Sequence, residues 1–297
     1  MQPLSAWSLT DRRHLIGVFT DIDDTLTTDG AITPEALQAL ACLKAAGLHV
    51  IPITGRPIGW CEPFASGDAS HAIQPWPVDA LVAENGAVAF AWNKHKKLSK
   101  IYQQSEATRT HNFAQMQQVA ARVLRDLPEA RLSQDSPGRE TDIAIDHSEF
   151  SHLPPEKIAR VVRIMQSAGM QATVSSIHIN GWFGSHNKLE GARWIVRELL
   201  GRDLDTELNQ WVYVGDSSND QIMFQHFKHS IGVANIRRFE AELNHRPRFI
   251  TPSERGAGFA EVARAILGAQ ISPRIESIND TTLNHSSCPP RPSTRPC

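Results

Sequence analysis

The chain has 297 residues, of which 41% are hydrophobic and 21% are charged, as is ordinary for a folded globular protein. Its formal net charge of −2 at pH 7 provides no global field that would attract nucleic acid or an anionic membrane. No apolar run approaches the roughly 20 residues that cross a bilayer, and residues 1–15 lack the apolar centre of a secretory signal, which favours the cytoplasm.

Short apolar runs alternate with a helical pattern near the start of the chain. Residues 15–19 suit a strand that is buried on both faces. A helix is predicted from Thr33, its N-cap, to Gly47, followed by strands over residues 48–53 and 79–83. Strand, helix and strand at this spacing indicate a parallel sheet with crossover helices.

The same pattern returns after residue 183. The predicted elements are helices over residues 188–200, 221–227 and 259–267 and strands over residues 211–214, 230–234 and 248–251. Residues 1–87 and 184–271 are therefore expected to form one Rossmann-like α/β core.

Residues 88–183 have a different character. The expected elements are strands over residues 87–92, 98–103 and 141–146 and helices over residues 112–127 and 155–168. This mixture predicts an inserted α+β unit, an antiparallel sheet with two helices on one face. From residue 272 to 297 few large apolar residues remain, so this tail is predicted to be disordered.

Polar clusters follow directly on the predicted strands of the core. They occupy residues 20–25, 54–56, 84–86 and 215–220. In open α/β sheets, ligands bind outside the carboxyl ends of the strands, so these clusters are expected to converge on one edge.

Three aspartates in these clusters point to a metal site. Asp21, Asp23 and Asp216 would bring carboxylates into one small site, which is costly unless a cation is bound there. Oxygen ligands favour a hard cation such as Mg²⁺.

The same edge offers groups that suit a phosphate. Thr54, Ser217 and the backbone amides near Gly55 can donate hydrogen bonds to phosphate oxygens. Aspartate is an established phosphoryl acceptor, so one carboxylate could attack phosphorus, while Asp23 could protonate the leaving oxygen.

Simpler interpretations of the acidic motif do not fit the sequence. A calcium loop of the EF-hand type needs glycine and glutamate where this chain has Leu26 and Ile32, so that interpretation fails. A role in a turn or helix cap suits one short motif, but not four clusters at one edge. The thirteen histidines and four cysteines show no zinc-site spacing.

Four motifs together resemble those of the haloacid dehalogenase-like phosphohydrolases. They are residues 21–27, residues 54–56, Lys188 and residues 215–220, in the family's order and at suitable spacing. The resemblance implies that Asp21 is the nucleophile and Asp23 the general acid and base. It also implies that Mg²⁺ is held by the Asp21 side chain, the Asp23 carbonyl and Asp216.

The resemblance assigns the remaining motif residues to the phosphoryl group and its support. Thr54, Gly55 and Lys188 would bind the transferring phosphoryl, and Asn219 and Asp220 would orient the metal shell and the lysine, with Ser217 beside them. The alternative for Lys188 is a surface lysine, but a cation is mildly unfavourable at the helix start where it lies.

The insertion resembles the family's second type of cap, which selects the substrate. Residues 84–87 and 256–259 resemble a subgroup that includes the sucrose-phosphate, trehalose-phosphate and mannosyl-phosphoglycerate phosphatases. This implies a sugar phosphate or a related small metabolite as substrate. Residues 184–187 depart from the acidic or glycine-rich turn that often precedes the motif lysine.

Several cap residues are candidates for reading the leaving group. Arg139, His178, Asn180 and Trp182 carry aromatic or planar polar groups that suit a sugar, and packing in the core or at the hinge is the alternative for Trp182. Arg56 could pair with Asp24 or contact the substrate, and the sequence does not separate these possibilities.

Two other functions are compatible with these motifs. A phosphomutase would return the phosphoryl group to the sugar instead of passing it to water. A phosphometabolite sensor without catalysis would not need both Asp21 and Asp23, and Asp23 also argues against a dehalogenase.

Overall fold

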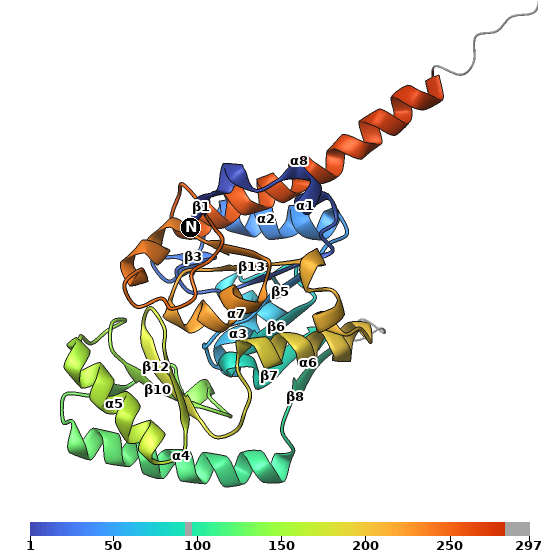
Figure 1. Cartoon of the computed structure of the whole chain (residues 1–297). Coiled ribbons are helices and arrows are strands. Elements are labelled where there is room, and N and C mark those ends of the chain that lie inside the picture. Colours follow the sequence, from blue (N-terminus) through green and yellow to red (C-terminus); the bar gives the residue numbers. More distant parts are fainter. Residues whose placement is uncertain (93–96, 283–297) are drawn as a thin grey trace, which may run out of the picture.

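The computed structural model describes residues 1–92 and 97–282, with side chains as far as residue 270. Its centre is a six-stranded sheet in the order β1-β15-β14-β13-β2-β5 (Figure 1). The strands are β1 (Gln2–Pro3), β2 (Gly17–Thr20), β5 (His49–Pro52), β13 (Trp211–Gly215), β14 (His229–Gly232) and β15 (Phe249–Ile250). Neighbouring strands run parallel throughout, which confirms the expected Rossmann-like core.

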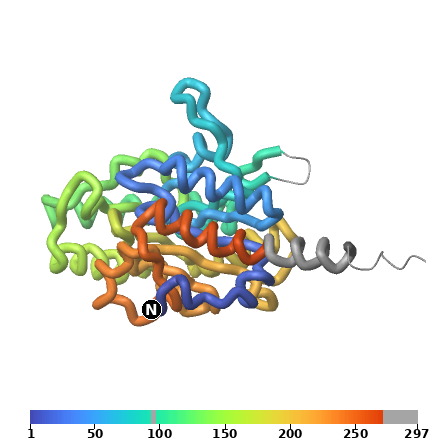
Figure 2. The backbone as a smooth tube through the Cα atoms, turned by 90° about the horizontal axis from the view of Figure 1, so that it is seen from above, coloured from blue at the N-terminus to red at the C-terminus, as the bar shows by residue number. Residues whose placement is uncertain are grey.

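Helices cover both faces of this sheet. On one face lie α1 (Leu9–Arg13), α2 (Pro34–Ala45) and α8 (Arg255–Thr282), and on the other lie α6 (Lys188–Leu200) and α7 (Gln221–His226) (Figures 1 and 2). Successive strand residues alternate between the two layers, so Val18 packs with the first set of helices and Phe19 with the second. Both central residues of β2 are therefore apolar, although they point to opposite faces of the sheet.

The predicted ends of α2 are confirmed by its caps. The Thr33 hydroxyl accepts a hydrogen bond from the Ala36 N–H at 3.2 Å, and Pro34 occupies the first helical position. Gly47, just beyond the helix, has φ of +86°.

The last helix, α8, extends further than the sequence pattern indicated. It continues to Thr282, so the expected disordered tail, residues 272–297, begins inside it. Residues 283–297 lie outside the described part of the chain.

A three-stranded meander extends the core beyond β5. It consists of β6 (Ala80–Ala83), β7 (Val88–Trp92) and β8 (Leu98–Tyr102), and the Thr54 N–H bonds the Val82 carbonyl at 2.9 Å where β6 passes the end of β5. Residues of β7 pack into both hydrophobic clusters of the core. We therefore propose that the inserted unit begins after β8 and not at residue 88.

The inserted unit, called the cap below, has its own antiparallel sheet in the order β11-β12-β10-β9. Its elements are α4 (Glu106–Asp126), β9 (Arg131–Leu132), β10 (Ile143–Asp146), α5 (Pro155–Ser167), β11 (Gln171–Val174) and β12 (His178–Trp182). Ile143, Ile145 and Ile179 pack with α4 and α5 in a separate hydrophobic cluster. Alternation along β12 turns His178 and Asn180 to the opposite face, toward the core.

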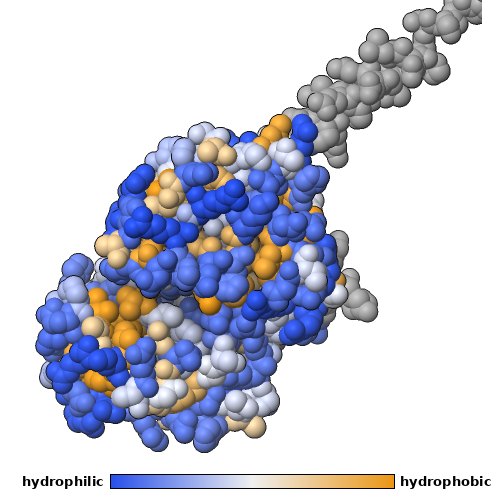
Figure 3. All heavy atoms as spheres, in the orientation of Figure 1, coloured by the Kyte–Doolittle hydropathy of each residue, from blue (hydrophilic) through white to orange (hydrophobic). Residues whose placement is uncertain are grey.

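Two shorter features complete the fold. The small hairpin of β3 (Thr27–Thr28) and β4 (Ala31–Ile32) follows the first acidic motif, and α3 (Ile58–Ser66) follows the second. Hydrophilic residues dominate the face that Figure 3 shows. Among the described helices, none combines the length and hydrophobicity that crossing a membrane requires.

Candidate active site

Asp21 stands at the carboxyl end of β2, which lies between β13 and β5 in the sheet. Its N–H bonds the Val214 carbonyl of β13 at 2.9 Å, which fixes the backbone at this point. The chain then turns, and the Ile22 N–H donates to Asp21 Oδ1 at 2.8 Å. The side chain of Asp21 is buried, so its position is set by the fold and not by solvent.

Asp216 follows the neighbouring strand β13 and is also buried. One carboxylate oxygen each from Asp21, Asp216 and Asp220 lies within 4.8 Å of the other two. Thr25 Oγ1 donates to Asp216 Oδ1 at 3.3 Å, and Asn235 Nδ2 donates to its Oδ2 at 3.0 Å. The structure thus brings the first and fourth motifs together at one point.

Asp220 is held by protein donors on both of its oxygens. Oδ2 accepts from the backbone N–H groups of Asp216 at 2.9 Å and Ser217 at 3.1 Å. Oδ1 accepts from Lys188 Nζ at 2.7 Å and from the Tyr213 hydroxyl. Because these four donors occupy it, Asp220 suits an orienting role, and Asp21 and Asp216 are the better cation ligands of the three.

Gly215 makes this arrangement possible. A Cβ at this position would lie 2.4 Å from Asp220 Oδ2, which no side chain could tolerate without moving the carboxylate. The glycine in the fourth motif is therefore required by the close approach of the Asp220 side chain to the end of β13.

Lys188 is the first residue of α6, and its ammonium group lies between two aspartates. Nζ is 3.0 Å from Asp21 Oδ1 and 2.7 Å from Asp220 Oδ1, and the residue is only 2% exposed. Burial alone would lower the pKa of Lys188, but Asp21 and Asp220 raise it above its ordinary value, so the lysine stays charged. Lys188 is therefore a buried ion-pair residue and not a surface lysine.

Lys188 is a single cation facing Asp21, Asp216 and Asp220, so it offsets only part of their negative charge. Burial raises the pKa of Asp21, and Asp220 and Asp23 add to this while Lys188 opposes it. Burial, Asp21 and Asp220 likewise raise the pKa of Asp216 well above its ordinary value. A divalent cation between Asp21 and Asp216 would relieve both effects, so these side chains fit a hard metal ion such as Mg²⁺.

The second motif lies next to these carboxylates, at the end of β5. Thr54 is fully buried, and its Oγ1 accepts a hydrogen bond from the Arg56 N–H at 3.0 Å, which leaves the hydroxyl proton to be donated elsewhere. The Gly55 carbonyl accepts from Arg139 Nη1 at 2.9 Å and from Asn180 Nδ2 at 3.2 Å. The cap therefore touches the backbone of this motif directly.

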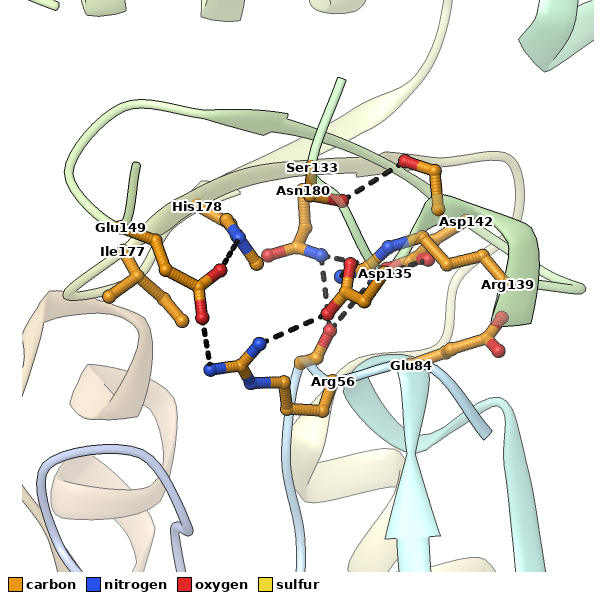
Figure 4. A network of polar contacts seen from close by, with 12 residues as sticks. Arg56, Glu84, Ser133, Asp135, Arg139, Asp142, Glu149, Ile177, His178 and Asn180 are labelled. Atoms are coloured by element: carbon orange, nitrogen blue, oxygen red, sulfur yellow. Dashed lines mark hydrogen bonds and ion pairs between the residues drawn. The ribbon is translucent and has the colours of Figure 1, made fainter. Parts of the chain in front are cut away.

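Arg56 joins Asp23 of the first motif to the cap, and Figure 4 shows its contacts with Asp135 and Glu149. Its Nε lies 3.0 Å from each carboxylate oxygen of Asp23, while Nη1 donates to Asp135 at 3.2 Å and Nη2 to Glu149 at 2.8 Å. The sequence suggested Asp24 or the substrate as partner of Arg56. The pairing with Asp24 is wrong, because that carboxylate faces away to Arg255, at 3.1 Å.

Three of the cap residues predicted to read the substrate lie at this junction (Figure 4). Arg139 pairs with Asp142 at 2.8 Å and with Asp135 at 3.1 Å. Asn180 donates to Asp142 at 2.9 Å, and His178 lies 2.8 Å from Glu149. These contacts are with protein groups, and a direct contact with substrate stays a prediction.

Glu84 is a site residue whose role the sequence did not reveal. It is fully buried, has φ of +49°, and accepts hydrogen bonds from the N–H groups of Ile58 at 3.0 Å, of Glu140 at 3.1 Å and of Thr141. This carboxylate therefore ties the core to the cap. The sequence predicted a polar cluster at residues 84–86, but the residues that bond to Glu84 lie far from it along the chain.

Comparison with known proteins bears on the family and the fold of the chain. Residues 18–262 match the family model of the haloacid dehalogenase-like hydrolases. No curated protein sequence matches the chain.

Solved structures with low sequence identity share the fold. A protein from Thermoplasma acidophilum is 17% identical, with a TM-score of 0.62 over 85% of this chain and 98% of the other. A protein from Plasmodium vivax described as a HAD/COF-like hydrolase is 15% identical, with a TM-score of 0.63 over 88% and 99%. The sucrose-phosphatase from Synechocystis, solved with sucrose and phosphate, is 14% identical, with a TM-score of 0.59 over 86% and 98%.

Proposed function

The chain belongs to the haloacid dehalogenase-like hydrolases, and we propose that it is a magnesium-dependent phosphatase that acts through an aspartyl-phosphate on Asp21. The observation that carries this proposal is the meeting of Asp21, Lys188 and Asp216 at the carboxyl edge of the sheet, where Thr54 follows the neighbouring strand β5. A nucleophile, a fixed cation and a pair of metal-binding carboxylates are what phosphoryl transfer requires.

The proposed reaction has two in-line steps. In the first, Asp21 attacks phosphorus, the bond from phosphorus to the ester oxygen breaks, and Asp23 gives that oxygen its proton. In the second, Asp23 takes a proton from water, which attacks the phosphorus of the aspartyl-phosphate and releases inorganic phosphate. Lys188 Nζ, 3.0 Å from Asp21 Oδ1, would neutralise charge on the phosphoryl oxygens throughout.

The metal would be held by the Asp21 side chain, the Asp23 carbonyl and the Asp216 side chain. When bound, Mg²⁺ supplies Lewis-acid stabilisation of the phosphoryl oxygens. Thr25 and Asn235 would hold Asp216 in place for this role, because each donates a hydrogen bond to one of its oxygens. Asn219 and Ser217 support the same loop, where the Ser217 hydroxyl donates to Asn219 Oδ1 at 2.8 Å.

We propose a small phosphorylated metabolite, such as a sugar phosphate, as the substrate, and a cytoplasmic location. The net charge of −2 gives no basis for a nucleic-acid or membrane partner. The cap, which touches Gly55 and Arg56, would cover the site during the first step and exclude water. Similar folds solved as sucrose-phosphatase and as a trehalose-6-phosphate phosphatase-related protein favour this substrate class.

The test is hydrolysis of p-nitrophenyl phosphate with Mg²⁺ by the wild type and by Asp21→Asn. The wild type is expected to release inorganic phosphate, and the variant to lose more than about 10³-fold in kcat while its circular dichroism is unchanged. Appreciable hydrolysis by the variant would overturn the covalent scheme. With a sugar phosphate, an isomerised product without free phosphate would show a phosphomutase instead.

A further inference from the structure

Arg56 is the side chain that links Asp23, the proposed general acid and base, to the rest of the protein. Its Nε lies 3.0 Å from each oxygen of Asp23, and its Nη2 lies 2.9 Å from Oδ1. Among the side chains of residues 1–92 and 97–270, no other one bonds this carboxylate. Because Oδ1 is held by two nitrogens and Oδ2 by a shared one, Oδ2 is the oxygen better able to carry the proton for the leaving group.

Burial alone does not hold the carboxylate of Asp23. Its side chain is 14% exposed, compared with 6% for Asp21. Asp23, Arg56 and Glu149 line one cavity of about 370 Å³ between the first motif and the cap. Without Arg56, the carboxylate of Asp23 would therefore be free to turn on the side of this cavity.

Two carboxylates of the cap hold Arg56 in turn. Nη1 donates to Asp135 at 3.2 Å and Nη2 donates to Glu149 at 2.8 Å (Figure 4). The guanidinium carbon also lies 5.2 Å from the centre of the Trp60 ring. A guanidinium is planar and its donors have fixed directions, so holding both Nη atoms also fixes the direction of the Nε–H bond toward Asp23.

Glu149 is itself held firmly within the cap. Its Oε2 lies 2.8 Å from His178 Nε2, while Oε1 faces Arg56. The loop that carries it follows β10, and the two carboxylate oxygens of Asp146 accept hydrogen bonds from the backbone N–H groups of residues 148–151 at 2.9 to 3.1 Å. Glu149 therefore moves with the cap, and its contact with Arg56 depends on where the cap lies.

We propose that Glu149 and Asp135 are positioning residues for the acid step, because through Arg56 they direct Asp23 toward the leaving oxygen when the cap lies on the core. The proposal rests on the proposed phosphatase function and adds the cap residues that control its proton transfer. In that step the proton passes from the Asp23 carboxyl group to the ester oxygen as the bond from phosphorus to this oxygen breaks. Neither cap residue needs to contact the reacting atoms for this role.

The experiment compares kcat/KM for benzyl phosphate and p-nitrophenyl phosphate with Mg²⁺ present. The benzyl alkoxide needs a proton as it leaves, whereas p-nitrophenolate leaves without one, so the first substrate depends far more on Asp23 as an acid. Glu149→Ala is expected to lower kcat/KM for benzyl phosphate about 10-fold or more, and that for p-nitrophenyl phosphate less than about 3-fold. Asp135→Ala should separate the substrates in the same direction. Equal losses on both substrates, or no loss on benzyl phosphate, would overturn the proposal.

Two further variants test whether Glu149 acts through Asp23. Glu149→Gln keeps an oxygen that can accept from Arg56, so it should recover part of the loss on benzyl phosphate. When Asp23→Asn is already present, Glu149→Ala should lower kcat/KM for benzyl phosphate by less than about 2-fold more, because the acid on which it acts is missing. A further loss of about 10-fold would show that Glu149 acts by another route.

The matched control is Glu140→Ala, which removes another cap carboxylate that reaches the core but not Arg56. Glu140 pairs with Lys100 of β8 at 2.6 Å. This variant should change kcat/KM for the two substrates by the same factor. If it separated them as Glu149→Ala does, the effect would come from a loosened cap and the positioning role would be refuted.

Failure of the phosphatase function gives a different result. A wild type that hydrolyses neither substrate with Mg²⁺ would overturn that function and this proposal with it. An active wild type whose Glu149→Ala variant loses equally on both substrates would overturn the positioning role alone.

Discussion

Replacing Asp220 by asparagine tests whether this residue holds the site together. The substitution keeps the shape of the side chain but removes its charge and one acceptor. In the structure one oxygen faces Lys188 and Tyr213, and the other faces two backbone N–H groups. Whichever way the amide turns, its NH₂ group meets two donors.

The expected cost follows from these contacts. Two hydrogen bonds to a charged group are lost, at about 1.5–3 kcal/mol each, which gives about 3–6 kcal/mol. Breaking a buried ion pair costs a similar amount. Since a domain of this kind is stable by about 5–15 kcal/mol, the loss should be plain in a urea titration. Displacement of Lys188 by about 1 Å should also lower kcat by about 10²-fold.

The matched control is Asp205→Asn, the same chemical change at the surface. Asp205 pairs with Arg193 at 2.9 Å, but its side chain is 49% exposed, so its loss should cost less than about 1 kcal/mol. If Asp220→Asn were no less stable than Asp205→Asn and kept its kcat, the orienting role assigned to Asp220 would be refuted.

Three further outcomes are expected. Removing divalent metal with EDTA should abolish hydrolysis of p-nitrophenyl phosphate and lower the Tm, and adding Mg²⁺ should restore both in the wild type. Mg²⁺ should raise the Tm of Asp216→Asn by less than that of the wild type. Equal Tm shifts in the two proteins would argue against Asp216 as a metal ligand. Arg56→Ala leaves Asp23 and two cap carboxylates without their cation, so the free energy of unfolding should fall by about 3 kcal/mol. The control is Arg238→Ala, whose side chain is 54% exposed, and its free energy of unfolding should fall by less than about 1 kcal/mol. Burial lowers the pKa of His186 in the folded chain to about 4, below its unfolded value of 6.5, so the unfolded chain binds a proton first as the pH falls. His186 should therefore lower the free energy of unfolding by up to about 3 kcal/mol between pH 6.5 and 4. His186→Phe should remove that part of the pH dependence, and superimposable pH profiles would show that the ring is not desolvated.

The sequence predicted the core because its local signals and its global fold agree. The apolar run of β2 is buried on both faces, and Thr33 and Gly47 mark the ends of α2. Parallel strands bring their carboxyl ends to one edge, so Asp21 and Asp216 could be expected to meet although they lie far apart in sequence.

The sequence could not predict which partner a charged side chain chooses. Asp23 and Asp24 are neighbours, but Asp24 has φ of +52° and faces Arg255, while Asp23 faces Arg56. That choice depends on the local turn and not on residue type. The contacts of Asp135 and Glu149 with Arg56 are equally hidden, because both residues lie outside the helices and strands of the cap.

The groups that cost the fold stability are gathered where ligands are proposed to bind. Asp21 and Asp216 are buried near one another, and a single lysine lies between Asp21 and Asp220. A bound cation would offset the charge of these carboxylates, so metal should raise the stability of the folded chain. The cap contacts the core through Gly55 and Arg56, so a substrate bound beside them should favour the closed arrangement in which Arg56 reaches Asp135 and Glu149.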